Sequence, residues 1–132
     1  MDVFLEEAAI LTGSRRGRVW LTRRCHPAQG APMSVEADWR WALRREERYG
    51  DVIGFYHTHP FTAGASPSER DVRTMRAWCG AFGKPMLCVI ACGTQAQTTL
   101  FANDEDEGQV LTITECFAGG LIVAVEEIAE ET

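Results

Sequence analysis

The order of apolar and polar positions near the start of the chain predicts a pair of strands. Residues 8–12 form a short apolar run, residues 13–17 have the composition of a turn, and residues 18–24 alternate between apolar and polar side chains. This succession is typical of a β-hairpin, so residues 8–24 are expected to pair with each other. Residues 27–33 contain two prolines and a glycine and are expected to form a loop.

A first helix is predicted where apolar side chains recur at helical spacing over residues 35–49. Ser34 is expected to be its N-cap, and Gly50 is expected to end it. On this helix we expect Trp39 in the core. Trp41 points away from the same face and is expected to be partly exposed.

A second helix is predicted after a strand at residues 51–57 and a loop at residues 60–66. Ser66 is followed by Pro67 and, three residues later, by Glu69. This pattern is that of a capping box with proline at the first helical position, so we expect the helix to begin there. Its buried side is expected to consist of Val72, Met75, Trp78 and Phe82.

The remaining strands are predicted in the second half of the chain. Residues 86–92 are continuously apolar, which indicates a central strand buried on both faces. Residues 96–102 and 109–117 are predicted to be strands joined by an acidic loop, and Gly119-Gly120 is predicted to be a turn. The pattern of residues 121–128 fits either a strand or a helix.

Length and composition place these elements in one α/β domain. The chain has 132 residues, 45% of them apolar, which suits a single domain over residues 1–132 with a mixed β-sheet flanked by helices. The net charge of −6 gives little support for nucleic-acid binding. Five arginines nevertheless lie between Arg15 and Arg24. They form either a surface for an acidic protein partner or a solvated face of the hairpin.

The cysteines and the apolar segments restrict the cellular setting. Five cysteines without a CxxC pair argue against a disulfide framework and against a zinc site built on cysteine. Cys88 and Cys92 lie in an apolar run and are expected to be small core residues. No signal peptide is recognisable, and the longest apolar stretches are too short to span a bilayer. We therefore expect a cytoplasmic protein without membrane association.

The candidate chemistry lies in His57-Thr58-His59-Pro60 and in Asp71. Two histidines at positions i and i+2 of a strand point to the same side, and the helix that carries Asp71 begins a short loop later. Two imidazoles and one carboxylate form a three-ligand zinc site with an open fourth position, as catalytic zinc requires. A base is also needed, and Glu6 or Glu7 is a candidate.

Each of these residues also has an ordinary structural interpretation. A histidine pair can occur by chance at the end of a strand, and Asp71 is favourable in the first turn of a helix because of the helix dipole. The joint occurrence of the histidine pair, the serine and the aspartate between a strand and a helix favours metal binding. Cys25-His26 is not expected to be a nucleophile pair, because adjacent side chains in a strand diverge.

These segments resemble the JAMM, or MPN-plus, metalloprotease motif of the bacterial and archaeal type. The matching residues are His57 to Pro60, Ser68-Glu69-Arg70-Asp71, and an upstream glutamate followed by small and aliphatic residues up to Gly13. Eight residues separate His59 from Ser68, one more than is usual in the family, and Gly64 allows the extra residue to bulge outward. The resemblance implies a JAB/MPN-like, cytidine-deaminase-like fold and Zn²⁺ bound by His57, His59 and Asp71.

The resemblance also implies an activity. Glu6, rather than Glu7, would take a proton from the attacking water and pass it to the leaving amine, and Ser68 would donate a hydrogen bond to the oxyanion. The bond cleaved would follow the C-terminal tail of a ubiquitin-like or sulfur-carrier protein, with a partner chain or a homodimer as a further expectation. Two alternatives stay open: a non-catalytic scaffold of the same fold that binds a partner protein, and a zinc hydrolase of a small-molecule amide.

Overall fold

A computed structural model of the chain describes residues 6–29, 37–60, 63–116 and 121–126. Within them the elements follow in the order β1 (Glu7–Arg16), β2 (Val19–Gln29), α1 (Trp39–Tyr49), β3 (Val52–Thr58), α2 (Glu69–Phe82), β4 (Met86–Cys92), β5 (Gln95–Phe101), β6 (Gln109–Cys116) and β7 (Leu121–Val125). This is the expected α/β class, with a mixed sheet and two helices.

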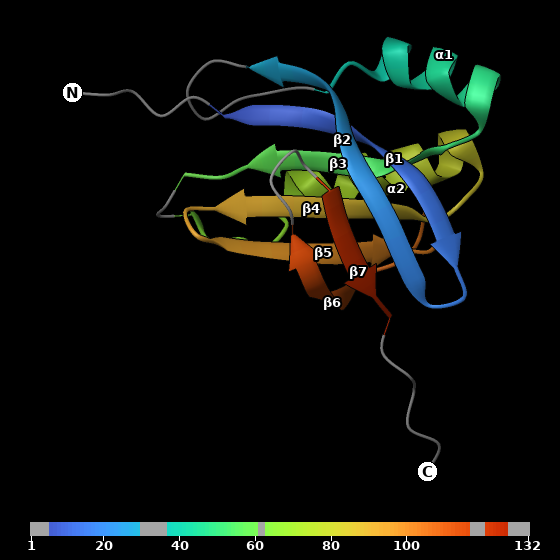
Figure 1. Cartoon of the computed structure of the whole chain (residues 1–132). Coiled ribbons are helices and arrows are strands. Elements are labelled where there is room, and N and C mark those ends of the chain that lie inside the picture. Colours follow the sequence, from blue (N-terminus) through green and yellow to red (C-terminus); the bar gives the residue numbers. More distant parts are fainter. Residues whose placement is uncertain (1–5, 30–36, 61–62, 117–120, 127–132) are drawn as a thin grey trace.

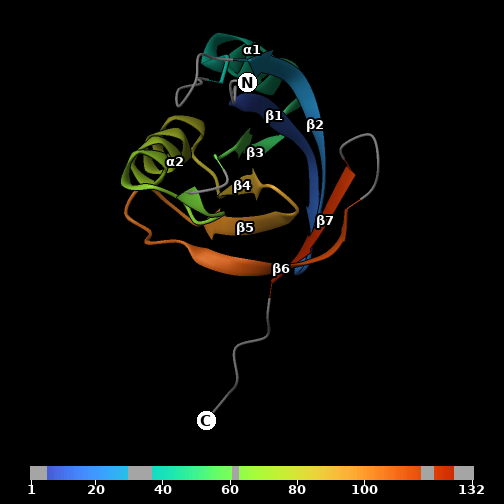
Figure 2. The same cartoon turned by 90° about the vertical axis from the view of Figure 1, so that its left-hand side faces the viewer.

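The strands form one sheet that closes on itself. Its order is β1-β2-β7-β6-β5-β4-β3, and β3 pairs back onto β1. All neighbours are antiparallel except β3 and β4, which run parallel and are connected through α2. Figure 1 shows the sheet with α2 behind β3 and β4, and Figure 2 shows both helices outside the curve of the strands. Helix α2 therefore begins on the outer face of the sheet, next to the point where the chain leaves β3.

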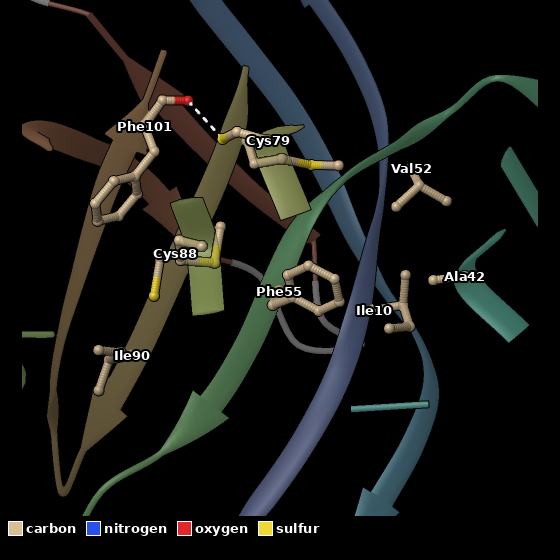
Figure 3. Packing of buried hydrophobic residues seen from close by; sticks show 10 residues of the cluster. Ile10, Ala42, Val52, Phe55, Cys79, Cys88, Ile90 and Phe101 are labelled. Carbon is tan, nitrogen blue, oxygen red and sulfur yellow. Dashed lines mark hydrogen bonds between the residues drawn. The ribbon is translucent and has the colours of Figure 1, made fainter. Parts of the chain in front are cut away.

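The closed sheet separates two apolar clusters because successive side chains of a strand point to opposite faces. Ile10, Phe55 and Cys88 pack on the helix side, whereas Leu11, Leu87 and Val89 pack on the inner side. Figure 3 shows the helix-side cluster, including the hydrogen bond that the Cys79 thiol donates to the carbonyl of Phe101. The strand at residues 86–92 is buried on both faces as predicted.

Helix α1 begins later than the sequence suggested. Its N-cap is Asp38, whose side chain accepts a hydrogen bond from the backbone N–H of Trp41, and Gly50 ends it in the left-handed conformation as expected. Ser34, the expected N-cap, lies outside the described residues. Trp39 is 51% exposed, so its expected core position is wrong. Trp41 is partly exposed as expected, and its buried part packs against the core.

Helix α2 also begins later than expected. The N-cap is Ser68 rather than Ser66, and the capping box closes on Asp71 rather than on Glu69. Pro67 consequently precedes the helix instead of occupying its first position. The expected buried side is confirmed, because Met75 is buried and Val72, Trp78 and Phe82 pack against the same cluster.

Other expectations have mixed outcomes. The hairpin is confirmed, but its turn lies only at residues 17–18, and β2 continues through Pro27 where a loop was expected. Residues 121–125 form a strand. Arg15 of the arginine segment is paired with Glu126, with an Nη2–Oε1 distance of 2.7 Å.

The cysteines agree with the expectation of no disulfide framework wherever their side chains are described. Cys25, Cys79, Cys88 and Cys92 are free thiols there, and the last two are buried. Among the described residues, no helix is long and apolar enough to cross a membrane.

Candidate metal centre

The two histidines stand at the end of β3. His57 is the penultimate residue of the strand, and His59 lies one residue beyond it. The backbone N–H of His59 still donates to the carbonyl of Ala91 on β4, at 2.9 Å, so the chain keeps its extended course. The two imidazole rings consequently lie on one side, with their centroids 4.7 Å apart.

Asp71 is brought to the histidines by the start of α2. It is the third residue of the helix and takes part in the capping box: its N–H donates to Ser68 Oγ at 3.1 Å, and its Oδ2 accepts from the Ser68 N–H at 2.8 Å. These bonds fix the carboxylate at the helix N-terminus. Its Oδ1 lies 3.0 Å from His57 Nε2, and its Oδ2 lies 3.1 Å from His59 Nε2.

The surroundings of Asp71 favour its ionised form. Burial alone raises the pKa of a carboxyl group, but here the hydrogen bond to His57 and its charge, together with the bonds from Ser68, outweigh burial. The net result is a pKa below the usual range of aspartate. The carboxylate is therefore an anion at neutral pH, as a metal ligand must be.

The hydrogen bonds of His59 indicate which of its ring nitrogens carries a proton and which faces the carboxylate of Asp71. Its Nδ1 lies 2.9 Å from the carbonyl oxygen of Gly64, which can only accept, so Nδ1 carries a proton. In neutral His59 the lone pair of Nε2 then points at a carboxylate oxygen of Asp71, 3.1 Å away. Two acceptors at this distance need either a second proton on the ring or a cation shared between them.

A metal ion fits this arrangement. The ligand atoms of His57, His59 and Asp71 all lie within 4.8 Å of one another. Ligands bound to zinc at about 2.0–2.1 Å in tetrahedral geometry are about 3.3 Å apart, close to the two nitrogen–oxygen distances seen here. The outward Nδ1–H of His59 is held by a backbone carbonyl, as is usual for metal-bound histidine. The group could therefore hold a metal ion.

The two candidate bases stand at the start of β1, where successive side chains alternate between the two faces of the sheet. Ala8 is paired with His57, so continuing this register places Glu6 opposite His59, with its side chain on the helix side. Glu6 is 9% exposed. Glu7 is exposed, and it lines a separate hollow with Arg24 and Pro27. Its N–H donates to Thr58 Oγ1 at 2.9 Å, which fastens the start of β1 to the end of β3.

The neighbouring cysteines are unsuited to nucleophilic chemistry. Burial, reinforced by the charge of Asp71, raises the pKa of the Cys88 thiol. Cys25 and His26 diverge as expected: the thiol of Cys25 contacts Thr12 Oγ1 at 3.2 Å, while the His26 ring stacks on Trp41 with centroids 4.5 Å apart.

A pocket of about 310 Å³ opens beside His57 and Asp71, and sequence reasoning did not find it. His57 and Asp71 belong to its lining, as do Trp39 from the start of α1 and Thr74 and Trp78 from α2. Trp39 is the first residue of α1 and is half exposed, whereas the sequence pattern put it in the core. The carbonyl of Gly64 was also missed as a partner of His59, because a backbone acceptor leaves no sequence signal.

Comparison with known proteins adds one finding. The family model described as prokaryotic homologs of the JAB domain matches residues 2–104, which contain all three ligands as well as Glu6 and Ser68. Strands β6 and β7 lie beyond the matched residues and complete the same closed sheet. No curated protein matches the chain.

Proposed function

The chain belongs to the prokaryotic homologs of the JAB domain, and we propose that it is a zinc-dependent peptidase or isopeptidase. It hydrolyses the bond that follows the C-terminal tail of a ubiquitin-like or sulfur-carrier protein. The family includes metalloenzymes, and the His57, His59 and Asp71 group could hold the metal. The observation that carries the proposal is the approach of Asp71 to both imidazoles at 3.0 and 3.1 Å.

In this proposal His57, His59 and Asp71 hold the metal through three ligand atoms and leave one position open. Zinc when bound polarises the substrate carbonyl and makes a water more acidic. The protein supplies a fixed ligand set for this purpose. The capping box orients Asp71, and the Gly64 carbonyl orients the His59 ring.

Proton transfer is assigned to Glu6. Glu6 immediately precedes β1, and extending the strand register puts it opposite His59. In this proposal its carboxylate accepts a proton from a water near the ligands and returns it to the leaving amine. Ser68 is assigned the hydrogen bond to the oxyanion. Its oxygen accepts from the Asp71 N–H, and its hydroxyl hydrogen, which the Asp71 carboxylate also attracts, would be donated to the oxyanion when substrate is bound.

The ubiquitin-like substrate comes from the resemblance to the JAMM motif, and an extended tail is the form in which such a segment would enter. A hydrolase of small-molecule amides is the second candidate. The specific observation in its favour is the pocket beside the ligands, at about 310 Å³ near the lower end of the range for small-molecule sites.

The test is zinc content and cleavage measured on the same preparations. We expect about one zinc per chain, cleavage of ubiquitin-like fusions, and loss of cleavage with a chelator that added zinc reverses. Glu6→Gln should retain zinc and lose at least about 100-fold in kcat, in line with the contribution of a general base. Glu7→Gln is the matched control and should cleave at the parent rate.

Each assignment has its own contrary result. A protein that binds no zinc would support the scaffold alternative. Zinc binding with cleavage of small amides only would support the second candidate. If Glu6→Gln cuts as fast as the parent while Glu7→Gln does not, the proton acceptor has been assigned to the wrong glutamate.

A further inference from the structure

The pocket beside the ligands has an apolar interior and a polar rim. Phe55, Met75 and Cys88 line it from the helix-side cluster, and all three are buried. Figure 3 shows Phe55 and Cys88 on neighbouring strands among the residues of that cluster. The rim is polar where the pocket meets His57 and Asp71.

Two tryptophans form walls of the pocket. Trp78 is held by its contacts with Phe55 and Phe82, at ring-centroid distances of 4.1 and 4.9 Å. Trp39 comes from the first residue of α1 and is half exposed. A second hollow, lined mainly by apolar residues between α1 and α2, has the same two tryptophans in its lining. A glycine or a charged group would gain no hydrophobic free energy of binding in such an interior, whereas an apolar side chain buried there would.

The size and the position of the pocket limit the occupant. A volume of about 310 Å³ holds one large side chain rather than a folded domain. Because His57 and Asp71 are themselves part of the lining, the pocket opens at the bond to be cleaved. Consecutive residues of an extended chain advance by about 3.3–3.6 Å, so the side chain that enters belongs to a residue within two positions of that bond.

We propose that this pocket is a specificity pocket for a bulky apolar or aromatic side chain next to the scissile bond. The inference rests on the proposed function, because it assigns the substrate residue read beside the same ligands. Substrates with leucine, phenylalanine or tryptophan at the matching position are cleaved with a higher kcat/KM than those with glycine. From the apolar area buried, the expected preference is about 10- to 100-fold.

The kinetic test uses zinc-loaded protein and a series of peptides in which each residue flanking the cleaved bond is varied in turn. Thr74 is exposed on α2 and lines the pocket, so Thr74→Phe should fill it without disturbing the core. We expect kcat/KM of this variant on the bulky substrates to fall about 10-fold or more relative to its kcat/KM on the glycine substrates. Arg73→Phe adds the same ring to an exposed position outside the lining and should behave as the parent.

A binding measurement on the metal-free protein gives a second readout. N-acetylphenylalaninamide should shift the indole NMR signals of Trp39 and Trp78 but not that of Trp20, whose Nε1 donates to Glu126 at 2.8 Å on another part of the molecule. N-acetylglycinamide should shift neither. Thr74→Phe should abolish the effect.

The outcomes separate the two proposals. Equal rates across the peptide series, or no shift of the Trp39 and Trp78 signals, would overturn the pocket assignment and leave the peptidase standing. Failure to cleave any member of the series or any ubiquitin-like fusion would overturn the proposed function, and the substrate assignment with it.

Discussion

Ser68 combines two roles that substitution can separate. Its Oγ accepts a hydrogen bond from the Asp71 N–H at 3.1 Å and caps α2, while its hydroxyl hydrogen is assigned to the oxyanion. Ser68→Ala removes both contributions. Ser68→Gly also removes the hydroxyl, but glycine is a far better N-cap than alanine. Ser68→Thr keeps both.

The expected magnitudes differ between stability and activity. Losing an N-cap to alanine costs about 1 kcal/mol, whereas replacement by glycine costs only a few tenths. For a domain of this size, 1 kcal/mol corresponds to a fall in Tm of about 3–5 °C. Removing an oxyanion donor costs about 10²- to 10³-fold in kcat. Alanine and glycine should therefore be equally inactive but differ in Tm, and threonine should be close to the parent in both.

The assay measures thermal unfolding, zinc content and kcat on the four proteins. Zinc content should not change, because the backbone N–H of residue 68, which holds Asp71 Oδ2 at 2.8 Å, is present in every variant. The reasoning is refuted if kcat follows Tm, with glycine close to the parent and alanine impaired. That result would mean that Ser68 acts only through the helix.

Two further predictions concern the fold. In the metal-free folded protein the pKa of Asp71 lies below its ordinary value of 3.8. Ionised Asp71 therefore stabilises the fold above pH 3.8, and this contribution is lost as the pH falls below that value. Asp71→Asn should flatten the fall in the urea unfolding midpoint between about pH 5 and pH 2, and an unchanged fall would contradict this prediction. A Cβ at Gly54 would clash with the backbone carbonyl oxygen of Leu87, so Gly54→Ala should lower the free energy of unfolding by about 3 kcal/mol or more. Gly80 lies inside α2, and a Cβ added there would make only an ordinary 3.5 Å contact with Cβ of Asp104, so Gly80→Ala should be neutral or stabilising. Equal destabilisation by both substitutions would count against this prediction.

The start of α2 illustrates where local pattern and tertiary structure disagree. Ser66 and Ser68 are each followed by an acid three residues later, so the sequence contains two overlapping capping boxes. The pattern favours the first, because Pro67 then occupies the first helical position, where proline is well tolerated. The structure uses the second, in which Asp71 both caps the helix and meets His57 and His59. That contact with another element is invisible to a local pattern.

The start of α1 was misplaced for a similar reason. Apolar spacing that began at Val35 put Trp39 on the buried face. Asp38 instead caps the helix and pairs with His26 at 2.9 Å, and Trp41 stacks on the same ring. These contacts come from β2, so only the pairing of the hairpin with the helix reveals them. The same misplacement concealed the pocket, since Trp39 forms one of its walls.

The His57, His59 and Asp71 group was predictable because its parts are close in sequence. A strand, a short loop and one helical turn fix their relation almost locally. The placement of Glu6 is a different problem, since it depends on pairing β1 with β3 across about fifty residues. Residues 8–11 are buried on both faces of the sheet, so they lack the alternation that would specify register.

A slip of one residue in that pairing would replace Glu6 by Glu7 beside the ligands. The structure fixes the register by packing rather than by pattern. Ile10 fills the helix-side cluster and Leu11 the inner one, and the Glu7 N–H is bound to Thr58 Oγ1. The position of Glu6 relative to His57 and His59, and with it the proposed choice of base, therefore depends on how Ile10 and Leu11 pack further along β1. A change that loosens this packing should impair the proposed proton transfer more than metal binding, because His59 and Asp71 lie outside β3 and only His57 is paired directly with a residue of β1.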